Sequence, residues 1–375
     1  MTSYTHRERV IAALNHREPD RVPVDLMGHA TMLLDETYER LRDFLGLSPI
    51  PPVRSGTSAN YYDERILAHF DVDFRRLFLK THPEAPLIHH PDGSYTDAWG
   101  ICSKRSGMHV NVVGSPLTSA STVAEVEAFA WPNVQQLFTA QGLAAEARRQ
   151  YEQTDYALVA RNPLSYGLRE RACMLMGMQE FMTALALQPA VAECIIGHLL
   201  DIYKDVYGMF LDAVGPYVQT VEVGDDLGSQ QGLLISASMY RRFFKPAERE
   251  LYDLIHAKAP GAKLIRHSDG AFFSLIPDLI EIGVDVLNPV QSSAKGMAAA
   301  TLKSTFGQQL AFHGGIESIE GDVPTDALIA EVKNRIDVLG PGGGYVLASC
   351  NHMMDVRPEN IIAMFETAHA YGRYR

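Results

Sequence analysis

Three side chains of this sequence have the types and spacing that could hold a metal ion. His267 and Asp269 follow the apolar run "AKLIR", and Cys350 follows "YVLAS". Side chains two residues apart on an extended segment point the same way, so an imidazole and a carboxylate can share a target. Zinc accepts nitrogen, oxygen and sulfur ligands, and catalytic zinc sites leave a fourth position open. In the alternative, purely structural interpretation, His267 caps a helix, Asp269 bonds its own backbone and Cys350 is a small buried apolar residue.

Glu222 is a further candidate ligand, because it alternates with two valines in "TVEVG". If Val221 and Val223 face outward, Glu222 faces the interior, where a buried carboxylate needs a cation, a metal or a proton. A register shifted by one residue would instead place Glu222 on the outside.

The loop "GDDLGSQQG" at residues 224–232 concentrates polar side chains behind the same run. Asp225 could act as an acid or base, and Asp226 and Gln230 could bind the hydroxyl or amine groups of a substrate. Adjacent carboxylates point to opposite sides of an extended chain, which argues against a dyad that shares a proton. Helix capping is the competing interpretation of this loop.

These residues require a scaffold of alternating strands and helices. From residue 155 onward, short apolar runs alternate with amphipathic segments of helical length, which is typical of parallel strands joined by right-handed crossovers. The pattern predicts an α/β chain folded as a closed (β/α)8 barrel, with its chemistry at the carboxyl ends of the strands. The expected strands are residues 21–26, 74–80, 156–161, 217–223, 262–267, 284–289, 310–314 and 344–349.

Outside the barrel, residues 82–135 are expected to form a hairpin and loop insertion, and the N-terminal segment a helical extension. No low-complexity linker interrupts the sequence, so residues 1–375 are interpreted as one domain.

Composition and charge limit the classes of function. The 375 residues are 46% hydrophobic and carry a formal net charge of -12 without clustered Lys and Arg, which argues against nucleic-acid binding. No apolar stretch of about 18 residues occurs, which argues against a membrane protein. The four cysteines lack paired spacing, which favours a reducing, cytoplasmic compartment. The glycine-rich "LGPGGGY" lacks the Lys of a phosphate-binding loop and precedes a strand rather than a helix.

The sequence resembles the uroporphyrinogen decarboxylase superfamily over nearly its whole length. This group includes the decarboxylase and the zinc-dependent methyltransferases that move methyl groups between corrinoid proteins and thiols such as coenzyme M. The resemblance implies a TIM barrel with its active site at the carboxyl ends of the strands. The segments that carry the resemblance are "RERVIAALNHREPDRVPV", "DERILAHFDVDF", "GDDLGSQ", "IPDLIEIGVDVLNPVQ", "FHGGI", "VLGPGGGYVLAS" and "RPENIIAMFETAHAYG".

Within the superfamily, the sequence is more similar to the methyltransferase branch. The decarboxylase carries two arginines after its N-terminal Pro-Val segment, where this chain has "GHATM" with His29. The decarboxylase's catalytic aspartate corresponds here to Lys80, and its C-terminal histidine to Cys350. The methyltransferase signature is His-x-Cys followed far downstream by a Cys. This chain keeps His267 and Cys350, and has Asp269 where the first Cys belongs.

The resemblance therefore implies a zinc-dependent methyltransferase that acts between a corrinoid such as methylcobalamin, or a methoxy donor, and a small thiol or hydroxyl acceptor. It implies a corrinoid protein, and a second copy of the chain in a homodimer, as partners. One alternative is a decarboxylase or lyase of a small acid or tetrapyrrole, with Arg161, Arg266 or Lys80 holding a carboxylate. Another is a metal-free binding partner of a corrinoid protein. In the methyltransferase interpretation the catalytic residues are His267, Cys350 and Asp225, the metal ligands are His267, Asp269, Cys350 and Glu222, and the substrate-binding residues are Asp226, Gln230, Asn288, His352 and His29.

Overall fold

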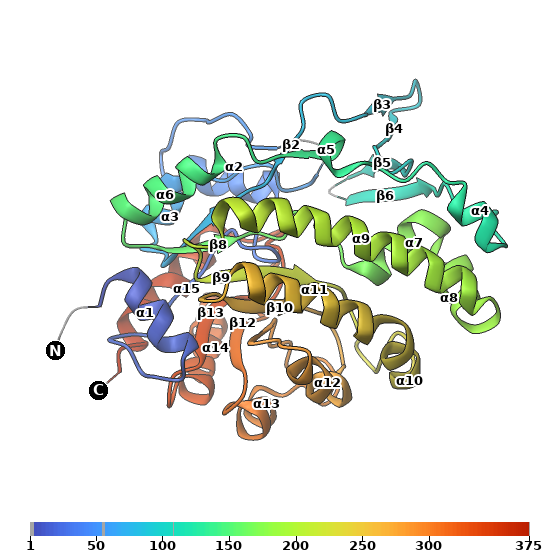
Figure 1. Ribbon diagram of the computed structural model, residues 1–375. Coiled ribbons are helices and arrows are strands. Elements are labelled where there is room, and N and C mark those ends of the chain that lie inside the picture. The colour runs from blue at the N-terminus through green and yellow to red at the C-terminus, as the bar shows by residue number, and fades with distance from the viewer. Residues whose placement is uncertain (1–3, 55–56, 108, 375) are drawn as a thin grey trace.

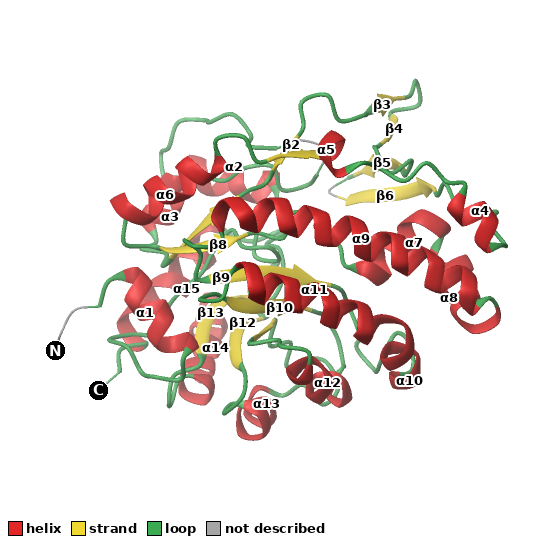
Figure 2. Ribbon diagram, in the orientation of Figure 1, coloured by secondary structure: helices red, strands yellow, loops and turns green. Residues whose placement is uncertain are grey.

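Seven parallel strands form the central sheet in a computed structural model, which describes residues 4–54, 57–107 and 109–374 (Figure 1). The strand order β1-β8-β9-β10-β11-β12-β13 follows the chain, and helices cover the outside of the sheet (Figure 2). The strands are β1 (Phe74–Leu77), β8 (Ala157–Ala160), β9 (Thr220–Gly224), β10 (Lys263–His267), β11 (Val286–Asn288), β12 (Ala311–Ile316) and β13 (Tyr345–Ser349).

The residues around Val24 fill the eighth position and close the barrel. Val24 forms a parallel bridge with Leu347 of β13, and the N–H of Asp25 donates to the carbonyl of Leu347 at 2.9 Å. On the other side, the N–H of Asp73 donates to the carbonyl of Val24 at 3.1 Å, immediately before β1 begins. Residues 21–26 thus join the first and last strands of the sheet, and the predicted (β/α)8 barrel is confirmed.

A buried carboxylate fixes this closure at the amino-terminal end of the barrel. Asp73 pairs with Arg9 and with Arg21, each at 2.7 Å, and accepts a hydrogen bond from the N–H of Val24 at 2.8 Å. Burial opposes ionisation, but hydrogen bonding from His6 and the charge of Arg21 still lower the pKa of Asp73. One charged side chain therefore ties the N-terminal helix, the closing segment and β1 together.

The interior of the barrel has an apolar layer near the amino-terminal ends of the strands and polar side chains near their carboxyl ends. The carboxyl end is called the upper end of the barrel below. Val10 and Leu14 of helix α1 (His6–Leu14) pack against inward-facing side chains of the strands, so the predicted N-terminal extension plugs the lower mouth. The apolar layer consists of Val10, Leu14, Phe74, Ala157, Val159, Ile265, Val286, Ala311 and Val346. Side chains alternate between the two faces of a strand, so the residue two positions after each member of this layer also faces the interior. It lies nearer the carboxyl end of the barrel.

Helices on the outside carry the second and larger core. Their apolar faces pack against the outward-facing strand residues, including Val221 and Val223. The helices after α1 are α2 (Asp35–Phe44), α3 (Glu64–His69), α4 (Val123–Glu127), α5 (Val134–Leu137), α6 (Leu143–Gln153), α7 (Leu168–Met176), α8 (Met178–Leu187), α9 (Pro189–Val214), α10 (Ala237–Met239), α11 (Lys245–Lys258), α12 (Ile276–Glu281), α13 (Ala299–Phe306), α14 (Thr325–Leu339) and α15 (Pro358–Tyr371).

The insertion predicted between β1 and β8 is a small antiparallel structure of its own. A four-stranded sheet has the order β3-β4-β5-β6, and a separate pair joins β2 to β7. In Figure 1 the insertion lies above α9. Its strands are β2 (Lys80–Thr81), β3 (Ile88–His89), β4 (Ser94–Thr96), β5 (Cys102–Ser106), β6 (His109–Gly114) and β7 (Phe138–Thr139).

Among the described residues, no single helix has both the length and the apolar composition needed to cross a membrane. The pair α8 and α9 meets these criteria only when both helices are taken together, and the chain bends by 119° between them.

Candidate active site

A chain of hydrogen bonds crosses the upper end of the barrel and ends at His267. The Nδ1 atom of His267 lies 2.7 Å from Oδ1 of Asn288, and Nδ2 of Asn288 lies 2.7 Å from Nδ1 of His313. The Nε2 atom of His313 lies 2.8 Å from Oδ2 of Asp25. Arg76 in turn pairs with both oxygens of Asp25. Five positions of the barrel, four strands and the closing segment, thereby contribute to one continuous network.

The asparagine sets the tautomer of both histidines in this network. Oδ1 of Asn288 can only accept, so Nδ1 of His267 must carry a hydrogen; Nδ2 can only donate, so Nδ1 of His313 must accept. His313 then donates its Nε2–H to Asp25, whose pKa is held low by Arg76 despite complete burial. The neutral form of His267 then carries its lone pair on Nε2, pointing away from the network, as expected of a metal ligand whose other ring nitrogen is fixed by a hydrogen bond.

Two carboxylates face that lone pair. One ligand atom each from Asp226, His267 and Asp269 lie within 4.8 Å of one another, and Nε2 of His267 is 3.8 Å from Oδ1 of Asp226. The N–H of Asp269 donates to Oδ1 of Asp226 at 2.8 Å, which fixes the two acidic residues relative to each other. Oδ1 of Asp269 is buried and has no hydrogen-bond partner among the described residues.

The electrostatics of this group fit a bound divalent cation. Burial and the negative charge of Asp226 raise the pKa of Asp269, and His267 offsets this only in part. A cation would satisfy the orphaned oxygen and relieve the repulsion between the two carboxylates. One imidazole nitrogen and two carboxylate oxygens form a ligand set that zinc accepts.

Glu222 faces the barrel interior, as expected if its neighbouring valines face outward. It pairs in register with Ile265, whose side chain belongs to the interior layer. Oε1 of Glu222 accepts from Nη2 of Arg76 and from the N–H of His29, each at 3.3 Å. Oε2 is buried and unpartnered within the described part of the chain. A narrow cavity above it is lined by Glu222, His29, Thr31, His267, Asn288 and His313, among others.

Cys350 is not part of the group formed by Asp226, His267 and Asp269. Its thiol is buried, and its Sγ donates to the carbonyl of Val290 at 3.3 Å. Burial is the main reason why the pKa of this thiol lies well above its usual range. In this position the sulfur is a protonated hydrogen-bond donor.

Asp225 caps a helix. Its carboxylate accepts from the N–H of Arg169 at 2.6 Å and from the N–H of Glu170 at 3.3 Å, in the first turn of α7. A Cβ atom on Gly167 would lie 2.2 Å from Cβ of Asp225, so only glycine permits this close approach. Burial raises the pKa of Asp225 to about 6, against the opposing charge of Arg169. Its oxygens therefore cap α7.

The other predicted substrate-binding residues differ in their contacts and in their exposure to solvent. The ring of His29 meets that of His267 edge to face at 5.6 Å, and Nδ1 of His352 accepts from the N–H of Met32 at 3.1 Å. Burial and the charge of Arg161 lower the pKa of both imidazoles, that of His352 to about 3, so both are neutral near pH 7. Gln230 is exposed on its loop.

Several residues of this end of the barrel carry weak sequence signals. In the sequence, Asp25 and Arg76 look like ordinary members of strand segments, and only the hydrogen-bond network of the structure reveals their link to His267.

Glu170 is a further residue that the sequence did not single out. It lies at the start of α7, where burial and the charges of Asp225 and Asp226 raise its pKa to about 8. A carboxylic acid that stays protonated near neutral pH is a candidate proton donor.

The three cations considered as carboxylate holders differ in their surroundings. Lys80 is exposed and lies 3.8 Å from Glu146, and Arg266 is fully buried in an ion pair of 2.9 Å with Glu248. Arg161 follows β8 at the upper end of the barrel, is buried, and has no ion-pair partner among the residues described. Only Arg161 thus combines burial, position and an unneutralised charge.

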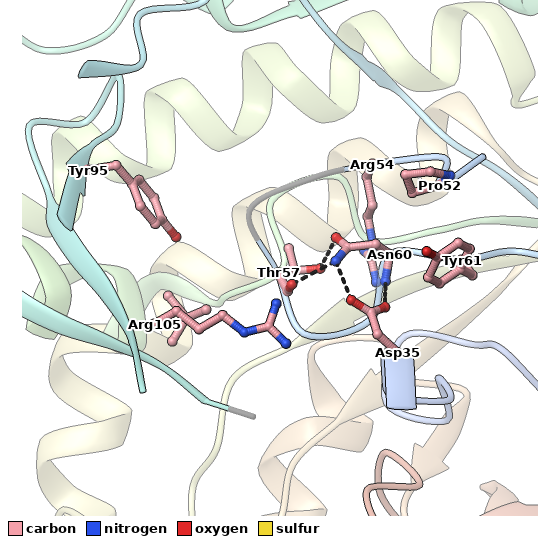
Figure 3. Close-up of a pocket in the computed structure, with 9 residues that line it drawn as sticks. Asp35, Pro52, Arg54, Thr57, Asn60, Tyr61, Tyr95 and Arg105 are labelled. Atoms are coloured by element: carbon pink, nitrogen blue, oxygen red, sulfur yellow. Dashed lines mark hydrogen bonds between the residues drawn. The ribbon is translucent and has the colours of Figure 1, made fainter. Parts of the chain in front are cut away.

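A second hollow, of about 520 Å³ and open to solvent, separates the insertion from the N-terminal part of the chain (Figure 3). Arg105 and Tyr95 reach into it from the insertion, opposite Thr57 and Asn60. The side chain of Asn60 is fixed by Asp35, whose Oδ2 accepts from its Nδ2 at 2.7 Å. The hollow gives the space above the barrel a polar, partly cationic wall.

Comparison with known proteins now gives the family. The sequence profile described as "Uroporphyrinogen decarboxylase (URO-D)" matches residues 170–371, more than half of the chain. The chain belongs to this family. The matched segment contains β9 to β13, and with them Asp226, His267, Asp269 and Asn288.

A solved methyltransferase structure shows the same fold across nearly the whole chain. A methyltransferase from Methanosarcina mazei is similar with a TM-score of 0.67 and 16% sequence identity, over 98% of this chain and 99% of that chain. Xylanase 10B from Thermotoga maritima matches 62% of this chain and 80% of its own, with 11% identity and a TM-score of 0.38. Among curated proteins, none matches this sequence.

Proposed function

We propose that this protein is a zinc-dependent methyltransferase that moves a methyl group between a corrinoid, or a methoxy donor, and a small thiol or hydroxyl acceptor. The observation that carries the proposal is the fixed lone pair of His267 beside Asp226 and Asp269. The whole-length similarity to the Methanosarcina mazei methyltransferase supports this branch of the family over the decarboxylase.

The proposed ligands are His267, Asp269 and Asp226. Compared with the set predicted from the sequence, which is His267, Asp269, Cys350 and Glu222, this proposal adds Asp226 and omits Cys350 and Glu222. Zinc held there would supply Lewis acidity, which lowers the pKa of a thiol or hydroxyl so that its anion is available near neutral pH. The protein's own contribution is to hold the ligands in place through Asn288 and His313.

The surrounding residues would orient the acceptor and exclude water. His29 and Asn288 line the cavity beside His267. His29 and His352 are neutral, so each ring can both donate and accept a hydrogen bond. The buried residues Glu222, Asn288 and His313 limit the access of water on the inner side of the site, which strengthens the polar interactions there.

A decarboxylase or lyase of a small acid is the second candidate. The observation in its favour is the buried charge of Arg161, which lacks a carboxylate partner in the described ranges and would be neutralised by the carboxylate of a substrate. Glu170, protonated near neutral pH, could then return a proton to the product carbanion.

Metal content and methyl transfer together test the proposal. We expect His267→Ala to contain one equivalent of zinc fewer than the purified wild-type protein, and to lose the wild type's methyl transfer from methylcobalamin to members of a panel of thiols and phenols. His256→Ala is the matched control, because this half-buried histidine bonds the carbonyl of Gly283 outside the site. A metal-free wild-type protein that releases CO2 from small acids, and loses this activity in Arg161→Gln, would establish the second candidate instead. Binding of a corrinoid protein without either activity would indicate a binding role.

A further inference from the structure

A second cluster of metal-ligating side chains lies outside the barrel, where the insertion meets α9. Cys194 and His198 are four residues apart on α9, so they lie on the same face of the helix. Glu127 is the last residue of α4, in the insertion. One ligand atom of each of the three lies within 4.8 Å of the others, and Sγ of Cys194 is 3.8 Å from Oε1 of Glu127.

Packing from the insertion orients this cluster. The indole of Trp131 stacks on the ring of His198, with centroids 4.7 Å apart and an interplanar angle of 17°. Trp131 is itself held by its indole N–H, which donates to the carbonyl of Val126 at 3.1 Å, and by the edge of Phe129. The imidazole is therefore restricted in rotation before any ligand binds, which lowers the entropy lost on binding.

The donor set is that of a zinc site. A thiolate, an imidazole and a carboxylate are all ligands of tetrahedral zinc, and the partly exposed position leaves the fourth place to water. On binding, the thiol of Cys194 loses its proton to solvent, and the two negative charges of thiolate and carboxylate balance the charge of Zn²⁺. Burial and the neighbouring Glu127 raise the pKa of this thiol, so binding should weaken as the pH falls.

We propose that Glu127, Cys194 and His198 form a second zinc site, which fastens the end of the insertion to α9. This proposal is independent of the one for the barrel: it involves other residues, another element pair and a structural rather than a catalytic role. Because Tyr95 and Arg105 of the insertion line one side of the hollow, fastening the insertion would also help to fix the shape of that hollow.

Cobalt substitution tests the site, because a thiolate ligand gives Co²⁺ an intense near-ultraviolet charge-transfer band that imidazole and carboxylate ligands do not. The double variant His267→Ala, Asp269→Asn removes the barrel site. After chelation, this protein should still bind one equivalent of Co²⁺ with the thiolate band, and Zn²⁺ should displace it. The band should disappear in Cys194→Ser and in His198→Gln made in the same background.

Cys173→Ser is the matched control, because Cys173 is also half-buried and lies outside the cluster. Limited proteolysis of the insertion gives a second readout: Zn²⁺ should slow cleavage in the background protein and have no effect in Cys194→Ser. Absence of a thiolate band in the background protein, or its persistence in Cys194→Ser, would overturn the proposal.

Discussion

Asn288 connects the two histidines of the network, so its removal should weaken metal binding without removing a ligand. In Asn288→Ala, the Nδ1–H of His267 loses its acceptor and Nδ1 of His313 loses its donor, two bonds of 2.7 Å each. The imidazole of His267 is then free to rotate and to exchange tautomers. Loss of such an outer partner typically lowers metal affinity about 10- to 100-fold, which corresponds to about 1.4 to 2.8 kcal/mol.

The measurement is zinc affinity by competition with a chromophoric chelator at pH 7, made in a Cys194→Ser background that lacks the second proposed zinc site, together with urea unfolding. Asn288→Asp should bind zinc more tightly than Asn288→Ala, because a carboxylate still accepts from His267. Asn360→Ala is the control, since this buried asparagine also forms hydrogen bonds through both atoms of its side-chain amide but lies outside the site, in the N-terminal turn of α15. Both alanine variants should lose about 1–3 kcal/mol of stability. Equal zinc affinity in Asn288→Ala and the wild type would refute the role assigned to the network.

Three further predictions concern Cys350, Gly167 and Asp73. Cys350→Ser should keep its zinc, because the sulfur bonds Val290 outside the ligand group; loss of one equivalent would make Cys350 a ligand after all. Gly167→Ala should destabilise the protein by about 2 kcal/mol in urea unfolding, because the new Cβ meets Asp225 and the carbonyl of Gly224; Gly232→Ala, with open space around it, should be neutral. The lowered pKa of Asp73 means that its contribution to stability is present above about pH 4 and is lost as the pH falls through the folded-state pKa. Asp73→Asn should cost about 3 kcal/mol at pH 7 and flatten the acid end of the stability profile, and an unchanged profile would contradict this assignment.

The sequence pattern was sufficient to predict the barrel, because each strand segment is short and apolar and is followed by polar residues. The segment 21–26 could be recognised as part of the sheet only from both of its neighbours, since within it Val24 alone bridges a strand of the barrel, and Arg21 bridges Arg373 near the C-terminus. The interior position of Glu222 followed from alternation, once the outward packing of its neighbouring valines had settled the register.

The site was harder to predict, because its ligands come from loops whose turns decide where each side chain points. Asp225 and Asp226 are adjacent in sequence and chemically equal, yet one caps α7 and the other faces His267. The difference depends on the close approach of Gly167, a contact between distant segments that no local pattern encodes. Whether Cys350 turns toward or away from the barrel axis depends in the same way on its neighbour Val290.

Closure of the barrel by an early segment also has a consequence for biosynthesis. His313 is separated from its partner Asp25 by 288 positions, and the bridge at Val24 waits for a strand that emerges still later. A nascent chain therefore cannot complete the network during most of its translation, and the Asp25–Arg76 pair must persist with one side uncovered. Contacts this distant slow folding, so the growing polypeptide is expected to depend on chaperones until its last βα unit leaves the ribosome.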